Sequence, residues 1–264
     1  MPHHSPLSSD PQSGNAFWII LLAIALLVAL TITITKSGEN TEQSGQRDRD
    51  RIQASDILRQ VKSMEQAVQN MRIAGIPEND ISFKNDVVAG YENYNCNVSW
   101  KTGDPGSPPD DDHPCEIFHV EGGGLSYKIP SPAWLDPGKK ANALYGEWYF
   151  YANACIPDVG TGDAGCSGDA RHAELIVALP WVTQDLCIEL NRLSGVQNLS
   201  DPIRPPQISG SAYKAALDKF TGVFEESEVI NNADDAFKGK ATGCFQGDTS
   251  PAGGYHFYHV LIPR

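Results

Sequence analysis

The sequence AFWIILLAIALLVALTITIT occupies residues 16–35 and contains no ionisable side chain. As an α-helix, a segment of this length spans about 30 Å, which matches the hydrocarbon core of a bilayer. The segment is apolar on every face and carries no cap, which favours a membrane span over a buried core helix. The sequence therefore predicts a transmembrane helix over residues 15–35.

A cleaved secretory signal is the alternative interpretation of this segment. Such a signal has a shorter apolar stretch, basic residues before it and a small-residue cleavage site after it. Residues 1–14 contain no Lys or Arg. A retained membrane span is therefore the favoured interpretation.

The rest of the chain is acidic. All 20 Lys and Arg and every acid except Asp10 lie beyond residue 35, in a chain with 33 acids and a formal charge of −13. Nucleic-acid binders need a positive surface that displaces phosphate counterions, so we expect no nucleic-acid partner. Residues 52–264 are numerous enough to bury a core and form the predicted exported domain.

Two signals conflict over the side of the membrane on which this domain lies. Lys36 and the arginines at positions 47, 49 and 51 follow the span, and the positive-inside rule would keep the domain in the cytoplasm. Six cysteines without a Cys-x-x-Cys pair instead favour disulfides in an oxidising compartment. Because Asp48 and Asp50 offset the arginines, we expect a single pass of the membrane with the domain exported.

The cysteines are the firmest chemical signal in the domain. They are Cys96, Cys115, Cys155, Cys166, Cys187 and Cys244. Six cysteines allow 15 pairings. Proximity in sequence favours Cys96 with Cys115 and Cys155 with Cys166, which leaves Cys187 with Cys244, and the predicted role of all three bonds is structural.

A polar stretch and a predicted helix follow the apolar segment. Residues 36–51 are polar and include Gly38 and Gly45, which is typical of a linker or a frayed helical stalk. Apolar residues then recur at three- and four-residue steps. This spacing predicts an amphipathic helix over residues 54–74 that packs on the domain's own sheet and ends at Gly75 and Pro77.

The remaining elements indicate an α+β fold with a mostly antiparallel sheet. Strands are predicted from β-branched and aromatic composition over residues 115–120, 124–129, 147–152 and 254–262. A second helix is predicted from Pro180 to Ser194, because proline suits a first helical position and Gly195 follows.

Several motifs suggest an enzyme or a metal site without supporting one. Gly160 to Gly165 match the dinucleotide-binding glycine pattern, but no strand-to-helix context surrounds them, which favours a disulfide-closed loop. His256 and His259 should point to opposite faces of one strand, and the acids at 110–112 lack the alternating spacing of a Ca²⁺ loop. We therefore expect no catalytic residues, no metal and no cofactor.

The order of these parts resembles the type IV pilins and pseudopilins of bacterial secretion and pilus systems. The residues that carry the resemblance are the junction Gly14-Asn15-Ala16-Phe17, the apolar span, the amphipathic helix and the disulfide-containing α+β domain. Uncharacterised alphaproteobacterial pilin-like proteins share this junction, a stretch like Phe118 to Gly124 and one like Phe257 to Leu261. The resemblance implies that residues 1–14 are a leader, that a prepilin peptidase cleaves between Gly14 and Asn15, and that the new N-terminus is methylated. It also implies that the span lies in the inner membrane, with the domain periplasmic or extracellular in a filament.

The resemblance also implies a structural function. The fifth residue after the junction is Ile19, where the family usually has Glu, so a minor pilin or pseudopilin is expected rather than a major subunit. Its expected partners are membrane lipid, the prepilin peptidase and the N-terminal helices of other pilin-like subunits. The alternative is a single-span, membrane-anchored domain that binds a ligand and forms no filament.

Overall fold

The computed structural model describes residues 15–99, 113–160, 166–214 and 217–264, without the side chains of residues 15, 16, 32–44 and 97–99. The chain divides into two units, Met1–Arg49 and Asp50–Arg264, and each is considered by itself. We call them unit 1 and unit 2. Leader residues 1–14 lie outside the described part of the chain.

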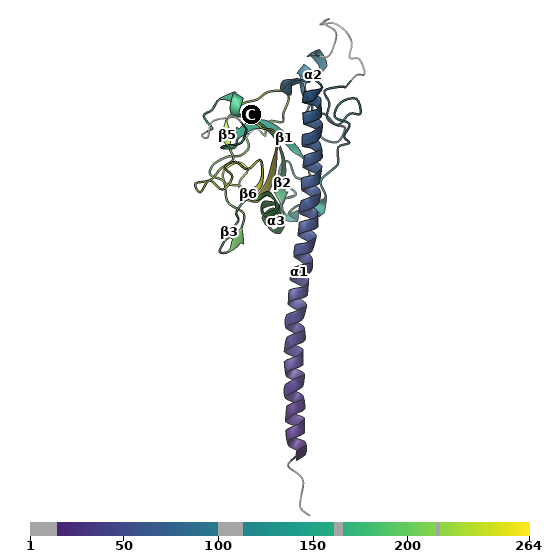
Figure 1. Cartoon of the computed structure of the whole chain (residues 1–264), viewed down its shortest axis with the longest axis vertical. Helices are drawn as coiled ribbons and strands as arrows, with labels where there is room; N and C mark the ends of the chain where they lie inside the picture. The colour runs from purple at the N-terminus through teal and green to yellow at the C-terminus, as the bar shows by residue number, and fades with distance from the viewer. Residues whose placement is uncertain (1–14, 100–112, 161–165, 215–216) are drawn as a thin grey trace, which may run out of the picture. The chain divides into compact units, whose positions relative to one another are not determined.

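One helix, α1 (Asn15–Ile73), includes the predicted span, the polar stretch and the amphipathic segment (Figure 1). The polar stretch 36–51 is helical throughout, and Gly38 and Gly45 do not interrupt it. Each glycine costs only about 1 kcal/mol relative to alanine in a helix, and good helix formers such as Glu, Gln and Arg surround this pair. Of the two sequence-based interpretations of this stretch, a linker or a helical stalk, the helix agrees with the stalk.

Helix α1 ends where the sequence predicts. Gly75 has φ +95°, a conformation that favours glycine, and the Ile76 amide donates to the Met71 carbonyl at 3.0 Å. Within the described residues, no helix carries an apolar stretch sufficient to cross a membrane. The side chains of residues 15, 16 and 32–35 of the predicted span lie outside the described ones.

Unit 2 contains the expected α+β arrangement with a mostly antiparallel sheet. The five-stranded sheet has the order β5-β1-β2-β7-β6, and only the short β1–β5 pair is parallel. Its strands are β1 (Tyr149–Cys155), β2 (Glu174–Val182), β5 (Glu228–Val229), β6 (Thr242–Gln246) and β7 (Tyr255–Ile262). A small hairpin pairs β3 (Leu199–Ser200) with β4 (Ile203–Arg204). The helices are α2 (Tyr94–Ser99) and α3 (Gln184–Ser194), with short 3-10 turns at Glu78–Asp80, Pro132–Trp134, Pro137–Lys139 and Ala170–His172.

Both faces of the sheet are buried. One face packs against α3 and the apolar stripe of α1, whose members Ile57, Val61, Met64, Val68 and Met71 are all buried. The other face packs against the loops that follow β1, α3 and β5. Alternation along β7 sends Phe257 and Leu261 to the first face and Tyr258 and Val260 to the second.

Three sequence-based predictions of secondary structure are wrong. Residues 115–120 and 124–129 form turns and irregular segments, in which Gly123 N donates to Glu116 O and Leu125 N donates to Ile117 O. Pro180 does not begin a helix. It lies in β2 opposite His256, and α3 begins four residues later. The strands at β1 and β7 and the helix end at Ser194 are confirmed.

Candidate functional site

The predicted cleavage pair falls at the edge of the described chain. Gly14 lies outside the described residues, and Asn15 is the first residue of α1, without a described side chain. The geometry of the junction therefore has no part in the following argument.

The apolar segment of α1 exposes its side chains in unit 1. Residues 17–31 are all exposed, and Phe17 and Trp18 have exposed fractions of 67% and 73%. None of these residues carries a charge. A contiguous apolar surface of this kind marks a site for lipid or for another apolar surface.

The C-terminal part of α1 is held in unit 2 by polar contacts as well as by its apolar stripe. Gln69 Nε2 donates to the Leu261 carbonyl at 3.0 Å, which joins α1 to β7. One turn earlier, Glu65 Oε2 lies 2.9 Å from His259 Nε2 and 2.6 Å from Lys62 Nζ. These contacts fix Glu65 and Gln69 of α1 to strand β7, which lies inside the sheet.

His259 connects this helix to two strands. Its Nδ1 lies 2.6 Å from Thr242 Oγ1 on β6, while its Nε2 contacts Glu65. The hydrogen bond from His259 lowers the pKa of Glu65 to about 2, against the opposing effect of burial. Burial lowers the pKa of His259 below its usual value.

A Thr–His–Glu chain has the residue types of a nucleophile, a base and an orienting acid. His259 is only 1% exposed, however, so a substrate cannot reach the imidazole in this conformation. The arrangement supports a structural clamp between α1 and the sheet. The sequence gives no sign of it, because Glu65 and His259 are 194 residues apart.

The structure pairs the cysteines as proximity in sequence predicts. Cys96 bonds to Cys115, Cys155 to Cys166 and Cys187 to Cys244, and no described cysteine is free. The first bond joins α2 to the turn at 113–124, the second closes the loop after β1, and the third ties α3 to β6.

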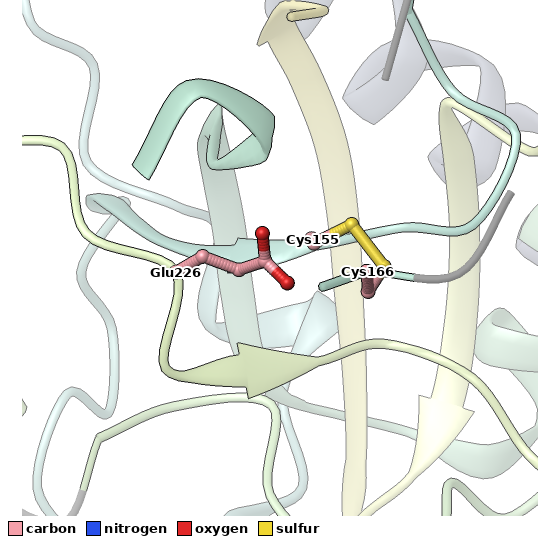
Figure 2. Close-up of side chains that lie close together, drawn as sticks. All are labelled: Cys155, Cys166 and Glu226. Atoms are coloured by element: carbon pink, nitrogen blue, oxygen red, sulfur yellow. A yellow bond between two sulfur atoms is a disulfide. The ribbon is translucent and has the colours of Figure 1, made fainter. Parts of the chain in front are cut away.

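The Cys155–Cys166 disulfide lies beside a buried carboxylate (Figure 2). Both sulfurs and a Glu226 oxygen lie within 4.8 Å of one another, which is the spacing that a metal ion requires, and no other such group occurs among the described residues. Both sulfurs are consumed by the disulfide bond, and a thioether-like disulfide sulfur cannot replace a thiolate ligand. The residues therefore do not fit a metal ion while this bond is intact.

Glu226 instead holds the segment that follows the disulfide-closed loop. Its side chain is 2% exposed, its Oε1 accepts from Gly168 N at 2.6 Å, and its Oε2 lies 3.6 Å from His172 Nδ1. Nearby Glu174, at the start of β2, accepts from Ile156 N at 3.1 Å through Oε2, while its Oε1 has no hydrogen-bond partner among the described residues. Burial raises the pKa of Glu174 to about 8, and the charge of Glu226 adds to the shift. Burial therefore favours the protonated form of Glu174.

The other motifs have varied outcomes. Residues 110–112 and 161–165 lie outside the described part of the chain. His256 and His259 do point to opposite faces, because His256 contacts Phe245 and Tyr213 whereas His259 contacts α1. His113 and His119 are apart in the sequence, but in the structure the centroids of their rings lie 4.3 Å from each other.

No protein-family model, no curated protein and no solved structure matches this chain.

Proposed function

We propose that this protein is a structural subunit, a minor pilin or pseudopilin of a type IV pilus or type II secretion-like filament. Residues 15–35 first hold the subunit in the inner membrane and then pack against the same segment of other pilin-like subunits. A prepilin peptidase cuts between Gly14 and Asn15. Unit 2 lies outside the cytoplasm, where its three disulfides persist.

One observation supports this proposal most. Helix α1 presents exposed apolar side chains over residues 17–31 and contributes a buried stripe to the core of unit 2 over residues 54–71. A single element thus joins an apolar surface that requires a non-aqueous partner to a folded, acidic domain. Processing by the peptidase rests on the resemblance of residues 14–17 alone.

Intact-mass measurement tests the processing step. The full chain is co-expressed with a type IV prepilin peptidase, and the expected product begins at Asn15. Gly14→Val should block cleavage, whereas the neighbouring Ser13→Val should leave it unchanged. A chain that still begins at Met1 in the presence of an active peptidase would contradict the pilin proposal.

Vesicle flotation tests the membrane step separately. Leu26 is 62% exposed and lies near the middle of the predicted span. An arginine there costs about 3 kcal/mol at a membrane helix centre, so Leu26→Arg should reduce the membrane partition constant by about 100-fold relative to Leu26→Ala and lower the floated fraction accordingly. Equal flotation of the two variants would show that this segment does not enter the bilayer.

A membrane-anchored domain that binds a ligand without forming a filament is the second candidate. A cavity of about 240 Å³ in unit 2 favours it. Uncleaved protein that nevertheless floats with vesicles would support this candidate over the first.

A further inference from the structure

The cavity lies on the second face of the sheet, where four separate segments meet. Its lining comes from residues 142–144, residues 180–181 at the end of β2, Tyr213 with Leu217, and residues 249–252 before β7. All of these residues are described. Small-molecule sites are typically concave, preformed and built from several segments with a few polar groups, and this cavity has that construction.

The backbone around the cavity is strained. Leu144, Trp181 and Leu217 have φ values of +64°, +64° and +52°, and they are three of the six non-glycine residues with positive φ in the described chain. This conformation costs roughly 1–2 kcal/mol for a residue with a Cβ. Strained residues persist where the surrounding structure demands them, and they gather at ligand sites. Half of the non-glycine residues with positive φ in the described chain therefore line this one cavity.

A β-bulge places the aromatic wall. The register between β2 and β7 shifts between Pro180 and Val182, so that the extra residue is Trp181. Leu179 and Val182 both belong to the core that faces α1. The bulge therefore lets Pro180 and Trp181 both line the cavity on the opposite face.

Hydrogen bonds hold these walls in place. Trp181 Nε1 donates to the Ala143 carbonyl at 2.8 Å, which ties two of the lining segments together. The amides of Ala212 and Tyr213 donate to the Ser250 carbonyl at 2.8 and 3.1 Å, which ties the other two. The cavity is thus preorganised, and a ligand would not need to order its walls.

The lining is neutral. Leu144, Pro180 and Trp181 provide apolar surface, and Asn142, Thr249 and Ser250 provide short amide and hydroxyl groups.

Among the described residues, none that lines the cavity is acidic or basic. Lys139 Nζ lies 5.7 Å from the Trp181 ring centre but does not line the cavity. Burial lowers the pKa of His256, whose ring lies against Trp181, to about 4. The chain's charge of −13 also disfavours anions. A second cavity of unit 2, of about 440 Å³, is different, because its lining includes the charged side chains of Lys214, Asp218, Lys219 and Glu225.

We propose that this cavity binds one neutral sugar ring, a hexose or an N-acetylhexosamine, as the free sugar or as the end of a glycan. A pyranose ring has an apolar C–H face that packs on an aromatic or aliphatic wall and hydroxyls that bond to neutral amide and hydroxyl groups. The volume of about 240 Å³ is below the usual range for drug-sized ligands and suits a single ring. The proposal does not depend on filament assembly.

Ligand-detected NMR tests this proposal on the full chain in a detergent without a sugar headgroup. The probes are the methyl glycosides of glucose, galactose and N-acetylglucosamine, with methyl glucuronide as the charged comparison. We expect at least one neutral glycoside to bind with a dissociation constant on the order of 1 mM, because a ligand of so few atoms makes limited contact. The glucuronide should bind at least tenfold more weakly.

Two variants place the binding in this cavity. Ala252 is exposed and lines it, so Ala252→Trp should fill it and weaken binding at least tenfold, while Asn142→Ala should weaken binding several-fold without filling it. Thr221→Trp, at an exposed position in the charged cavity, is the matched control and should bind as the unmodified chain does. No binding of any neutral glycoside at about 10 mM, binding of the glucuronide alone, or unchanged binding by Ala252→Trp would each overturn the proposal.

Discussion

Removal of individual disulfides should destabilise unit 2 in an order set by the length of chain that each bond closes. Cys187 and Cys244 are 57 residues apart in sequence, whereas Cys155 and Cys166 are 11 apart. In the chain-entropy relation, closure of these loops contributes about 4.2 and about 2.8 kcal/mol at 25 °C. Cys187 and Cys244 are also fully buried, so their loss adds to the larger value. The Cys187→Ala/Cys244→Ala variant should therefore be less stable than Cys155→Ala/Cys166→Ala by at least about 1.4 kcal/mol, or tenfold in the folding equilibrium constant.

Urea unfolding under non-reducing conditions measures this difference. Both double variants keep the remaining two disulfides, and the midpoints of fluorescence and circular dichroism transitions should coincide if unit 2 unfolds in one step. Cys96→Ala/Cys115→Ala is the internal check. Its 19-residue separation places its expected loss between the other two, at about 3.2 kcal/mol. Equal losses, or a larger loss from the 11-residue loop, would refute the argument from loop length.

Three further outcomes follow from single side chains. Burial raises the pKa of Glu174 from 4.5 to about 8, so between these pH values the folded state binds a proton that the unfolded state has lost, and the free energy of unfolding should fall as pH rises. Glu174→Gln should flatten that decline in urea titrations at several pH values. Glu65→Gln removes the carboxylate that contacts the buried His259, and thermal unfolding should show a loss of about 1–3 kcal/mol, whereas an unchanged midpoint would mean that α1 needs no polar clamp. A Cβ at Gly254 (φ +72°) would lie 2.8 Å from the indole of Trp181, while one at Gly253 (φ +64°) would meet no atom within 4 Å. Gly254→Ala should therefore lower the thermal unfolding midpoint more than Gly253→Ala, and equal midpoints would argue against steric contact.

Local sequence signals account for the parts of the fold that depend on neighbouring residues. The apolar spacing of α1 and its end at Gly75 are visible because helix periodicity and helix termination are local properties. The disulfide pairs also follow sequence order, since short loops close most readily.

Tertiary context decides the elements that the sequence does not reveal. Pro180 has the local preference of a helix start, yet its place in β2 beside a bulge depends on β7, which lies more than 70 residues further along the chain. Residues 115–120 and 124–129 have strand composition but find no partner strand in the described part of the chain, apart from a single bridge between Ser82 and Glu116.

The candidate sites are non-local in the same way. Four segments between residues 142 and 252 line the cavity, and no spacing rule connects them. Glu174 and Glu226 also come from different elements, and only the packed structure shows that their charges interact.

The position of strand β7 affects the order in which the sheet can assemble. Strand β7 follows every other strand of its sheet in the chain, yet it lies between β2 and β6 and pairs with both. Until β7 pairs, one edge of β2 therefore stays open, although all nine residues of β2 are buried in the finished domain. Such an open edge can pair with other chains. The central part of the sheet is thus completed only when residues 255–262 take their place between β2 and β6.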